Sequence, residues 1–299
     1  MNSIAITRSN CLKFGTDIRK GTNSPELGAK SEGGAIPPPV TTKPNVMIDK
    51  LIERGAIFFI NDSGGKDSQA MKIFLSKVVP HDQLVIVHAD LPEVDWEGCW
   101  SHVQENSMGI EAHMVRAGKT FFEMVEHRGM FPSPSYRQCT SDLKRQPIEK
   151  FIRNWCKERG KNLIVNCMGI RAEESSARAK QTPFRINERN SKAGREWYDW
   201  LPIFDWSVKE VWAEIESVGQ KRHYAYDLGM SRLSCVFCIM SNKSDIKVAA
   251  KHNPDLYRRY VETEERLGFT LLMSGKEKNW LRDIVEGDAV VNIPEFVCG

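Results

Sequence analysis

The chain has 299 residues, of which 41% are hydrophobic and 27% charged, and its formal net charge at pH 7 is +3. This length fits one large α/β domain or two smaller ones, and the apolar fraction supports a buried core. So small a net charge does not by itself indicate a nucleic-acid or membrane partner. No run approaches the roughly 18 apolar residues of a membrane-spanning helix, and the N-terminal sequence MNSIAITRSNCLKFG lacks the apolar centre of a secretory signal. We therefore expect a cytoplasmic protein without membrane contact.

Three regions differ in composition. Residues 1–45 are rich in Gly, Ser, Pro, Thr and Lys and predict a flexible N-terminal segment to which the sequence gives no role. A short helix is expected from Met47 to Arg54, at the start of an α/β domain over residues 46–220. Residues 221–299 are predicted to form a helical region that carries cysteines. The eight cysteines of a cytoplasmic chain indicate buried, reactive or metal-bound thiols rather than a disulfide framework.

A glycine loop between a strand and a helix is the most specific feature. The apolar run Ala56–Ile60 predicts a buried strand, and apolar residues at helical spacing follow from Ala70. Between them lie Ser63, Gly64, Gly65, Lys66, Asp67 and Ser68. A helix N-terminus and close backbone N–H groups bind anions, so this pattern predicts a phosphate site. Lys66 supplies positive charge, and Asp67 can cap the helix, hold Mg²⁺ or do both.

A second apolar strand over residues 83–87 ends at His88 and Asp90. Two strands joined by one helix make a parallel, right-handed βαβ unit, and ligands bind beyond the carboxyl ends of such strands. His88 and Asp90 are therefore expected beside the glycine loop. Asp90 is interpreted as a nucleotide or magnesium contact, the alternative being a cap or turn residue.

Further along, Cys139 follows Arg137 and precedes a Ser-Asp helix start. A thiol at a helix N-terminus near basic residues should have a lowered pKa; a purely structural cysteine is the equally weighted alternative. Residues 137–161 hold eight Lys and Arg against three Asp and Glu, and residues 171–195 hold seven against three. These two stretches are interpreted as solvated faces or as anion-binding tracks.

Another buried strand, residues 162–167, leads into Gly169, Arg171 and Arg178. Arginines at a strand end suit a phosphate or sulfate group, because guanidinium binds oxyanions through two hydrogen bonds. Residues 182–194 show no clear period and predict a mobile loop. Ser207 and Glu210 then match a capping box at the start of a helix.

The last motif is Cys235-x-x-Cys238, a metal or redox spacing. A closed zinc site needs four ligands, whereas an Fe–S cluster with one open iron fits three thiolates, and Cys139 is the natural third. Cys298 could be a fourth ligand, a mobile catalytic thiol or neither.

Several of these segments occur in the order seen in the phosphoadenylyl-sulfate (PAPS) reductase family and cover most of residues 56–240. They are SGGKDS at 63–68, RQCT with LK and P at 137–147, GIRAEESSAR at 169–178, LPIFDWSVKEVW at 201–212 and YDLGMSRLSCVFC at 226–238. The glycine loop resembles the PP-loop of ATP pyrophosphatases. The resemblance implies an adenine-nucleotide α-hydrolase-like (Rossmann-like) parallel sheet with helices on both faces.

Two activities remain open under this resemblance. The intact SGGKDS loop favours ATP, held with Mg²⁺ and cleaved to AMP and pyrophosphate through Lys66 and Asp67, with a [4Fe-4S] cluster on Cys139, Cys235 and Cys238. The acceptor would be a nucleic acid, or a sulfur-donor protein would act as partner. The alternative is a thiol-dependent PAPS reductase in which Cys298 is the nucleophile; the chain ends in Cys-Gly but lacks the family's neighbouring Glu and His. A nucleotide- or nucleic-acid-binding protein without turnover is a third interpretation, and the oligomeric state is not predicted.

Overall fold

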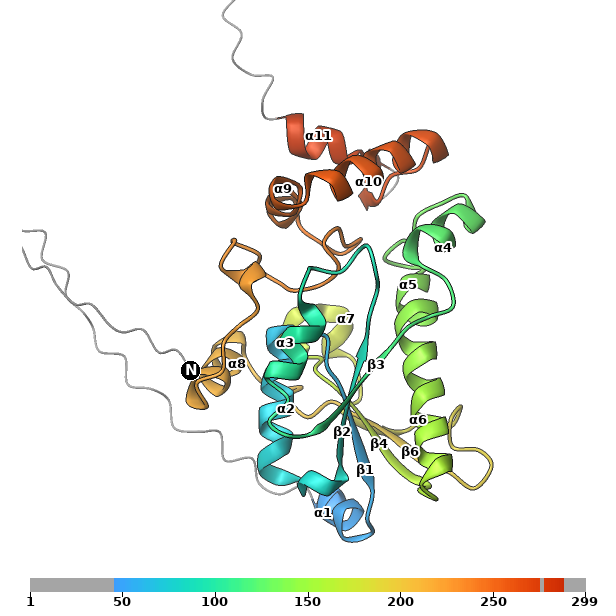
Figure 1. The fold of residues 1–299 in the computed structure, drawn as a ribbon, viewed down its shortest axis with the longest axis vertical. Helices are drawn as coiled ribbons and strands as arrows, with labels where there is room; N and C mark the ends of the chain where they lie inside the picture. Colours follow the sequence, from blue (N-terminus) through green and yellow to red (C-terminus); the bar gives the residue numbers. More distant parts are fainter. Residues whose placement is uncertain (1–45, 275–276, 288–299) are drawn as a thin grey trace, which may run out of the picture. The chain divides into compact units, whose positions relative to one another are not determined.

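The structure is a computed structural model that describes residues 46–274 and 277–287 (Figure 1). All of these residues belong to one compact unit. Cys298, expected to be a cluster ligand or a nucleophile, lies outside the described residues.

A six-stranded sheet forms the centre of the fold, in the order β3-β2-β1-β4-β6-β5. Five strands are parallel to their neighbours, and β5 runs antiparallel to β6. This confirms the predicted α/β fold with a mostly parallel sheet. The strands are β1 (Ile57–Asn61), β2 (Leu84–Ala89), β3 (Glu111–Val115), β4 (Leu163–Met168), β5 (Phe184–Ile186) and β6 (Glu196–Trp200).

Helices cover both faces of the sheet, which is why its central strands are apolar throughout rather than alternating. Phe58 and Ile60 of β1 pack against α2 (Lys66–Val78) and α8 (Val208–Ser217), together with α1 (Val46–Glu53) and α3 (Cys99–Glu105). Phe59, on the other face, packs edge-on against Trp155 of α6 (Gln146–Glu158), with the ring centroids 5.4 Å apart. Figure 1 shows α6 across the sheet from α2 and α3.

A third group of buried residues lies beyond the sheet and joins residues 91–143 to residues 225–284. Tyr260 is its centre, with rings of Phe121, Phe122 and Phe131 around it. The cysteines at 139, 235 and 238 pack against this group. Its helices are α4 (Phe121–Arg128), α9 (Lys243–His252), α10 (Pro254–Leu267) and α11 (Leu281–Glu286), beside a two-stranded ribbon of β7 (Leu272–Ser274) and β8 (Glu277–Asn279).

Short elements complete the chain. A three-residue α5 (Gln138–Thr140) continues through a π-helical turn, Ser141–Arg145, into α6, and α7 (Ser176–Ala179) follows β4. Single 3-10 turns lie at His81–Gln83, Ala172–Glu174 and Tyr224–Tyr226. Among the described helices, none is long and apolar enough to cross a bilayer.

Local signals predicted most of these elements. The lead-in helix is present as α1, and the capping box of Ser207 and Glu210 begins α8 as expected. The interpretation of residues 182–194 as a loop without regular structure was wrong, because β5 lies within them. Phe184 stacks on Tyr198 with centroids 5.1 Å apart, so a cross-strand partner rather than a sequence period creates this short strand.

Candidate functional site

The carboxyl ends of β1 and β4 meet at the point where the strand order reverses, since β2 and β3 follow on one side of β1 and β4 and β6 on the other. Open parallel sheets bind ligands at this point. Gly169, just after β4, packs directly on the start of α2. A Cβ atom at Gly169 would lie 2.9 Å from the carbonyl carbon and oxygen of Asp67. Any residue with a side chain would therefore push the two segments apart.

A buried ion pair forms the floor of the glycine loop. Asp62 accepts hydrogen bonds from the Gly64 N–H and the Ser68 hydroxyl, both at 2.9 Å, and from Nζ of Lys72 at 2.6 Å. Both charged side chains are 1% exposed. Burial alone would raise the pKa of Asp62, but Lys72 and the hydrogen bonds outweigh it and hold the pKa below its usual value. Sequence reasoning missed this pair. It could have been found from Lys72, a lysine placed on the buried side of α2.

Some backbone N–H groups of the glycine loop are hydrogen-bonded and others are not. The Ser63 N–H donates to the Ser68 hydroxyl, and the Lys66 N–H donates to the Tyr226 phenol at 2.9 Å. Within the described chain, the N–H groups of Gly65 and Asp67 have no acceptor. Two unpaired donors at the N-terminus of a 13-residue helix can bind an oxyanion.

Three charged side chains converge above these donors. Lys66 is 6% exposed, and its Nζ lies 3.3 Å from one carboxylate oxygen of Asp67. The other oxygen accepts from Nε of Arg171 at 2.6 Å. Arg171, which the sequence suggests as an anion ligand, thus lies beside the glycine loop. Its guanidinium is 4% exposed and also donates to Glu173 and to the Trp206 carbonyl, so it is an internal partner rather than a presented anion ligand.

Arg178 forms an ion pair with Glu174. The Glu174 carboxylate also accepts from the Arg171 backbone N–H at 3.0 Å. The structure thus links the two predicted arginines through Glu174.

His88 lies directly under the glycine loop, as expected from the parallel strands. Its Nδ1 is 2.8 Å from the backbone carbonyl oxygen of Asp62, and its ring stacks on Trp100. A carbonyl only accepts, so Nδ1 carries the proton and Nε2 presents a lone pair. Asp90 forms an ion pair with Arg116 of the segment after β3.

The segment that contains the Cys-x-x-Cys motif is fastened to the glycine loop. The Tyr226 phenol oxygen accepts from the backbone N–H groups of Lys66 and Leu233. Burial raises the pKa of Tyr226 to about 12, so the phenol stays neutral. The Leu233 side chain packs over Gly64, and the Val236 N–H donates to the Val94 carbonyl at 2.8 Å. Sequence reasoning did not predict a role for Tyr226.

The three predicted metal-binding cysteines are brought close enough for their charges to interact, with Lys144 among them. The lowered pKa expected for Cys139 was wrong: burial raises it, and the nearby Lys144 only partly offsets this. Burial likewise raises the pKa of Cys235. In turn, the charge of Cys235 raises the pKa of Lys144. The helix start and the basic neighbours are present, but desolvation of the thiol is the larger effect.

The spacing of these thiols discriminates between metal centres. One tetrahedral zinc with bonds of about 2.3 Å requires sulfurs about 3.8 Å apart. In the part of the chain that the structure describes, no set of three ligand atoms with a cysteine falls within 4.8 Å. The described thiols therefore do not have the spacing of a single zinc site.

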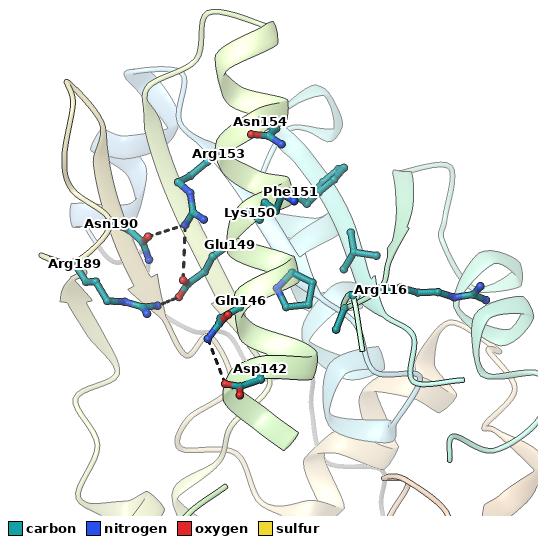
Figure 2. Close-up of a pocket in the computed structure, with 14 residues that line it drawn as sticks. Arg116, Asp142, Gln146, Glu149, Lys150, Phe151, Arg153, Asn154, Arg189 and Asn190 are labelled. Carbon is teal, nitrogen blue, oxygen red and sulfur yellow. Dashed lines mark hydrogen bonds and ion pairs between the residues drawn. The ribbon is translucent and has the colours of Figure 1, made fainter. Parts of the chain in front are cut away.

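A cavity of about 710 Å³ lies on the α6 side of the sheet and contains none of the glycine-loop residues. Figure 2 shows around it Lys150 and Arg153 from the first basic stretch noted in the sequence, Arg189 from the second, and Arg116 from outside both. Glu149 is 6% exposed and pairs with Arg153 and Arg189. Lys150 and Arg116 also line the cavity, and no ion pair within the described residues engages Lys150.

Known proteins resemble this chain over different lengths. An uncharacterized protein of Methanocaldococcus jannaschii is 29% identical over 70% of the chain and 44% of its own length. An uncharacterized 37.8 kDa protein from the gpa 5′ region of Escherichia phage 186 is 30% identical over 49% of the chain and 43% of its own length. The chain thus spans less than half the length of these curated relatives.

Among solved structures, phosphoadenylyl-sulfate (PAPS) reductase from Candida auris, in a phosphate complex, aligns with a TM-score of 0.43. The alignment has 15% identity and covers 66% of this chain and 89% of the reductase. The family model described as phosphoadenosine phosphosulfate reductase domain matches residues 58–241. Because this match covers well over half of the sequence, the chain belongs to the phosphoadenosine phosphosulfate reductase domain family.

Proposed function

We propose that this protein binds ATP with Mg²⁺ at the glycine loop and cleaves it to AMP and pyrophosphate, thereby adenylating an acceptor in sulfur-transfer chemistry. The observation that carries the proposal is the pair of unpaired N–H groups, of Gly65 and Asp67, at the N-terminus of α2 beside the Lys66 ammonium. These groups suit the β- and γ-phosphates of ATP, which become the leaving pyrophosphate.

The step requires orientation and charge stabilisation more than covalent chemistry. A nucleophilic oxygen of the acceptor attacks the α-phosphorus, the bond to the α–β bridging oxygen breaks, and pyrophosphate leaves with the electron pair. Ser63 and Ser68 offer hydroxyls to the phosphates, and Lys66 stabilises the charge that develops on the leaving group. Asp67 is already paired with Lys66 and Arg171, so its role here is to position Lys66.

The alternative activity, thiol-dependent reduction of PAPS, assigned Arg171 to the sulfate or the 3′-phosphate. The guanidinium of Arg171 is buried and bound to Asp67, Glu173 and a backbone carbonyl. Freeing it for a ligand would leave Asp67 with only one cationic partner. This arrangement favours ATP as the substrate. Cys298, the nucleophile of the alternative, lies outside the described residues.

The cysteines at 139, 235 and 238 would hold a [4Fe-4S] cluster, which when bound offers an open iron site for sulfur. The Tyr226 phenol and the Leu233 side chain connect this region to the glycine loop, so adenylation and sulfur delivery would take place near one another. A sulfur-donor protein would be the partner that supplies the sulfur.

The cavity beside α6 supports a nucleic acid as acceptor. Arg116, Lys150, Arg153 and Arg189 line it, while only Glu149 and Asp142 are acidic (Figure 2). Arg116 also reaches Asp90 at the glycine-loop edge, which links the cavity to the nucleotide site. Phosphate contacts of this kind weaken with salt. A protein that binds nucleic acid here without turning over ATP is the third interpretation, and it would show that salt dependence without pyrophosphate release.

The test compares ATP·Mg²⁺ and PAPS as substrates for protein purified without oxygen, with a thiol reductant present. We expect pyrophosphate from ATP, its loss in Lys66→Ala, and normal release in Lys77→Ala, which removes a surface lysine paired with Glu214 at the other end of α2. Unchanged pyrophosphate release by Lys66→Ala would refute the proposal. Sulfite from PAPS would instead establish the reductase.

A further inference from the structure

The carboxyl end of β2 carries three potential metal ligands from one short stretch of chain. One ring nitrogen of His88 and one carboxylate oxygen each of Asp90 and Asp95 all lie within 4.8 Å of one another. A tight loop returns Asp95 to this position: the N–H groups of Val94 and Asp95 both donate to the Leu91 carbonyl, and the Leu91 N–H donates to Asp95.

The imidazole of His88 gives a second, independent indication that a ligand binds here. The side chain is 2% exposed, and Nε2 is buried without any hydrogen-bond partner in the described structure. Nδ1 is held by the Asp62 carbonyl at 2.8 Å, so Nε2 is the nitrogen that is left to coordinate. A buried nitrogen lone pair without a partner is costly in a folded protein. A carbonyl that fixes the other ring nitrogen is the usual support of a metal-bound histidine.

Each carboxylate also keeps one oxygen available. Oδ2 of Asp90 pairs with Arg116, and Oδ2 of Asp95 accepts from the Leu91 N–H. No described residue donates to Oδ1 of Asp90 or Oδ1 of Asp95. Bonds of about 2.2 Å place neighbouring ligands of an octahedral ion about 3.1 Å apart. Small rotations of the two aspartate side chains would close the group around one ion.

We propose that His88, Asp90 and Asp95 form a protein-bound site for a divalent transition-metal ion, separate from the Mg²⁺ that accompanies ATP. The imidazole nitrogen sets the metal class: Mg²⁺ takes oxygen ligands, whereas a mixed nitrogen and carboxylate set suits Mn²⁺, Fe²⁺ or Zn²⁺. The positive neighbours are Arg116 on Asp90 and Lys144 near Asp95. Arg116 is 57% exposed in its side chain and can leave Asp90 when a cation binds.

The experiment uses full-length, chelator-stripped, nucleotide-free protein titrated with Mn²⁺ and followed by electron paramagnetic resonance. Because no nucleotide is present, failure here is independent of failure of the pyrophosphatase proposal. We expect one bound Mn²⁺ with nitrogen coupling from an imidazole, retained in about a hundred-fold excess of Mg²⁺. His88→Gln should lose the nitrogen coupling and weaken binding at least about 10-fold. Asp95→Asn should weaken binding similarly and keep the coupling.

Two further variants keep the proposal falsifiable. His81→Gln changes an exposed histidine in the 3-10 turn that precedes β2 and should bind Mn²⁺ as the wild type does. Arg116→Ala removes the cation that competes for Asp90 and should tighten binding several-fold. Absence of Mn²⁺ binding, or unaltered affinity and coupling in a folded His88→Gln protein, would overturn the site. Equal displacement of Mn²⁺ by Mg²⁺ would overturn the assigned role of the imidazole.

Discussion

Nε of Arg171 donates to Oδ1 of Asp67 at 2.6 Å, across 104 positions of the sequence. This contact joins the turn after β4 to the first turn of α2, next to the place where Gly169 packs on the same peptide. From its sequence position Arg171 resembles an anion ligand. In the structure its guanidinium instead pairs with a residue of the glycine loop.

Replacing that arginine should destabilise the fold. Arg171→Ala removes one donor each from Asp67, Glu173 and the Trp206 carbonyl, and we expect the free energy of unfolding to fall by about 3 kcal/mol. Denaturant unfolding measures this. Arg54→Ala, which breaks an exposed pair with Glu196, should cost under about 1 kcal/mol. Equal effects of the two changes would contradict the buried role of Arg171.

A methyl group at Gly169 should disrupt nucleotide binding. In Gly169→Ala the new Cβ meets the Asp67 carbonyl group at 2.9 Å, so β4 and α2 must separate at a cost of about 1–3 kcal/mol. We expect a lower melting temperature and loss of the stabilisation by ATP that the proposed function predicts for the wild type. Gly287→Ala, where a Cβ would meet none of the described residues within 4 Å, is the matched control and should change neither quantity.

Glu264 should make stability depend on pH. Its side chain is nearly fully buried, and burial raises its pKa from 4.5 to about 7, although it accepts hydrogen bonds from the Leu271 and Leu281 N–H groups. Between those values the folded protein holds more protons than the unfolded chain. The free energy of unfolding should therefore fall as pH rises from about 5 to 8, by at most about 3 kcal/mol from this group.

Denaturant unfolding at several pH values compares the wild type with Glu264→Gln; the variant should lose the decrease that Glu264 contributes, so the slope of its free energy of unfolding against pH should be more positive than that of the wild type. The comparison with a variant is needed because burial lowers the pKa of His102 to about 4, which gives the opposite slope at the acidic end. Glu265→Gln alters the exposed neighbour that pairs with Arg282 and should keep the wild-type slope. An unchanged slope in Glu264→Gln would contradict the raised pKa.

A [4Fe-4S] cluster on the three cysteines would colour the protein. Protein purified without oxygen should absorb in the visible range, and Cys235→Ser should remove most of that absorption because one of three protein ligands is lost. Cys156→Ser changes a cysteine buried on α6 against the opposite face of the sheet and should keep the absorption. A colourless wild-type protein, or a Cys235→Ser protein that keeps its colour, would argue against the cluster.

Local patterns were sufficient wherever the physical cause is local. The apolar run before the glycine loop, the helix spacing after it and the capping box at Ser207 each follow from neighbouring residues, and all three are found in the structure. β5 was not predicted, because its three residues carry no period and pair only through β6. Cys139 was placed correctly near basic residues, but the sequence could not show how far its thiol is buried.

The sequence by itself determined the family, the parallel sheet and the strand-loop-helix that carries the glycine loop, since these depend on residue order and spacing. Tertiary structure decided how the charges are used: Lys72 neutralises Asp62, Arg171 is committed to Asp67, and the Asp62 carbonyl leaves Nε2 of His88 as the free nitrogen. The partners of two of these contacts are separated by 26 and 104 positions. Desolvation and hydrogen bonding depend on such distant neighbours, so they are set only when the chain has folded.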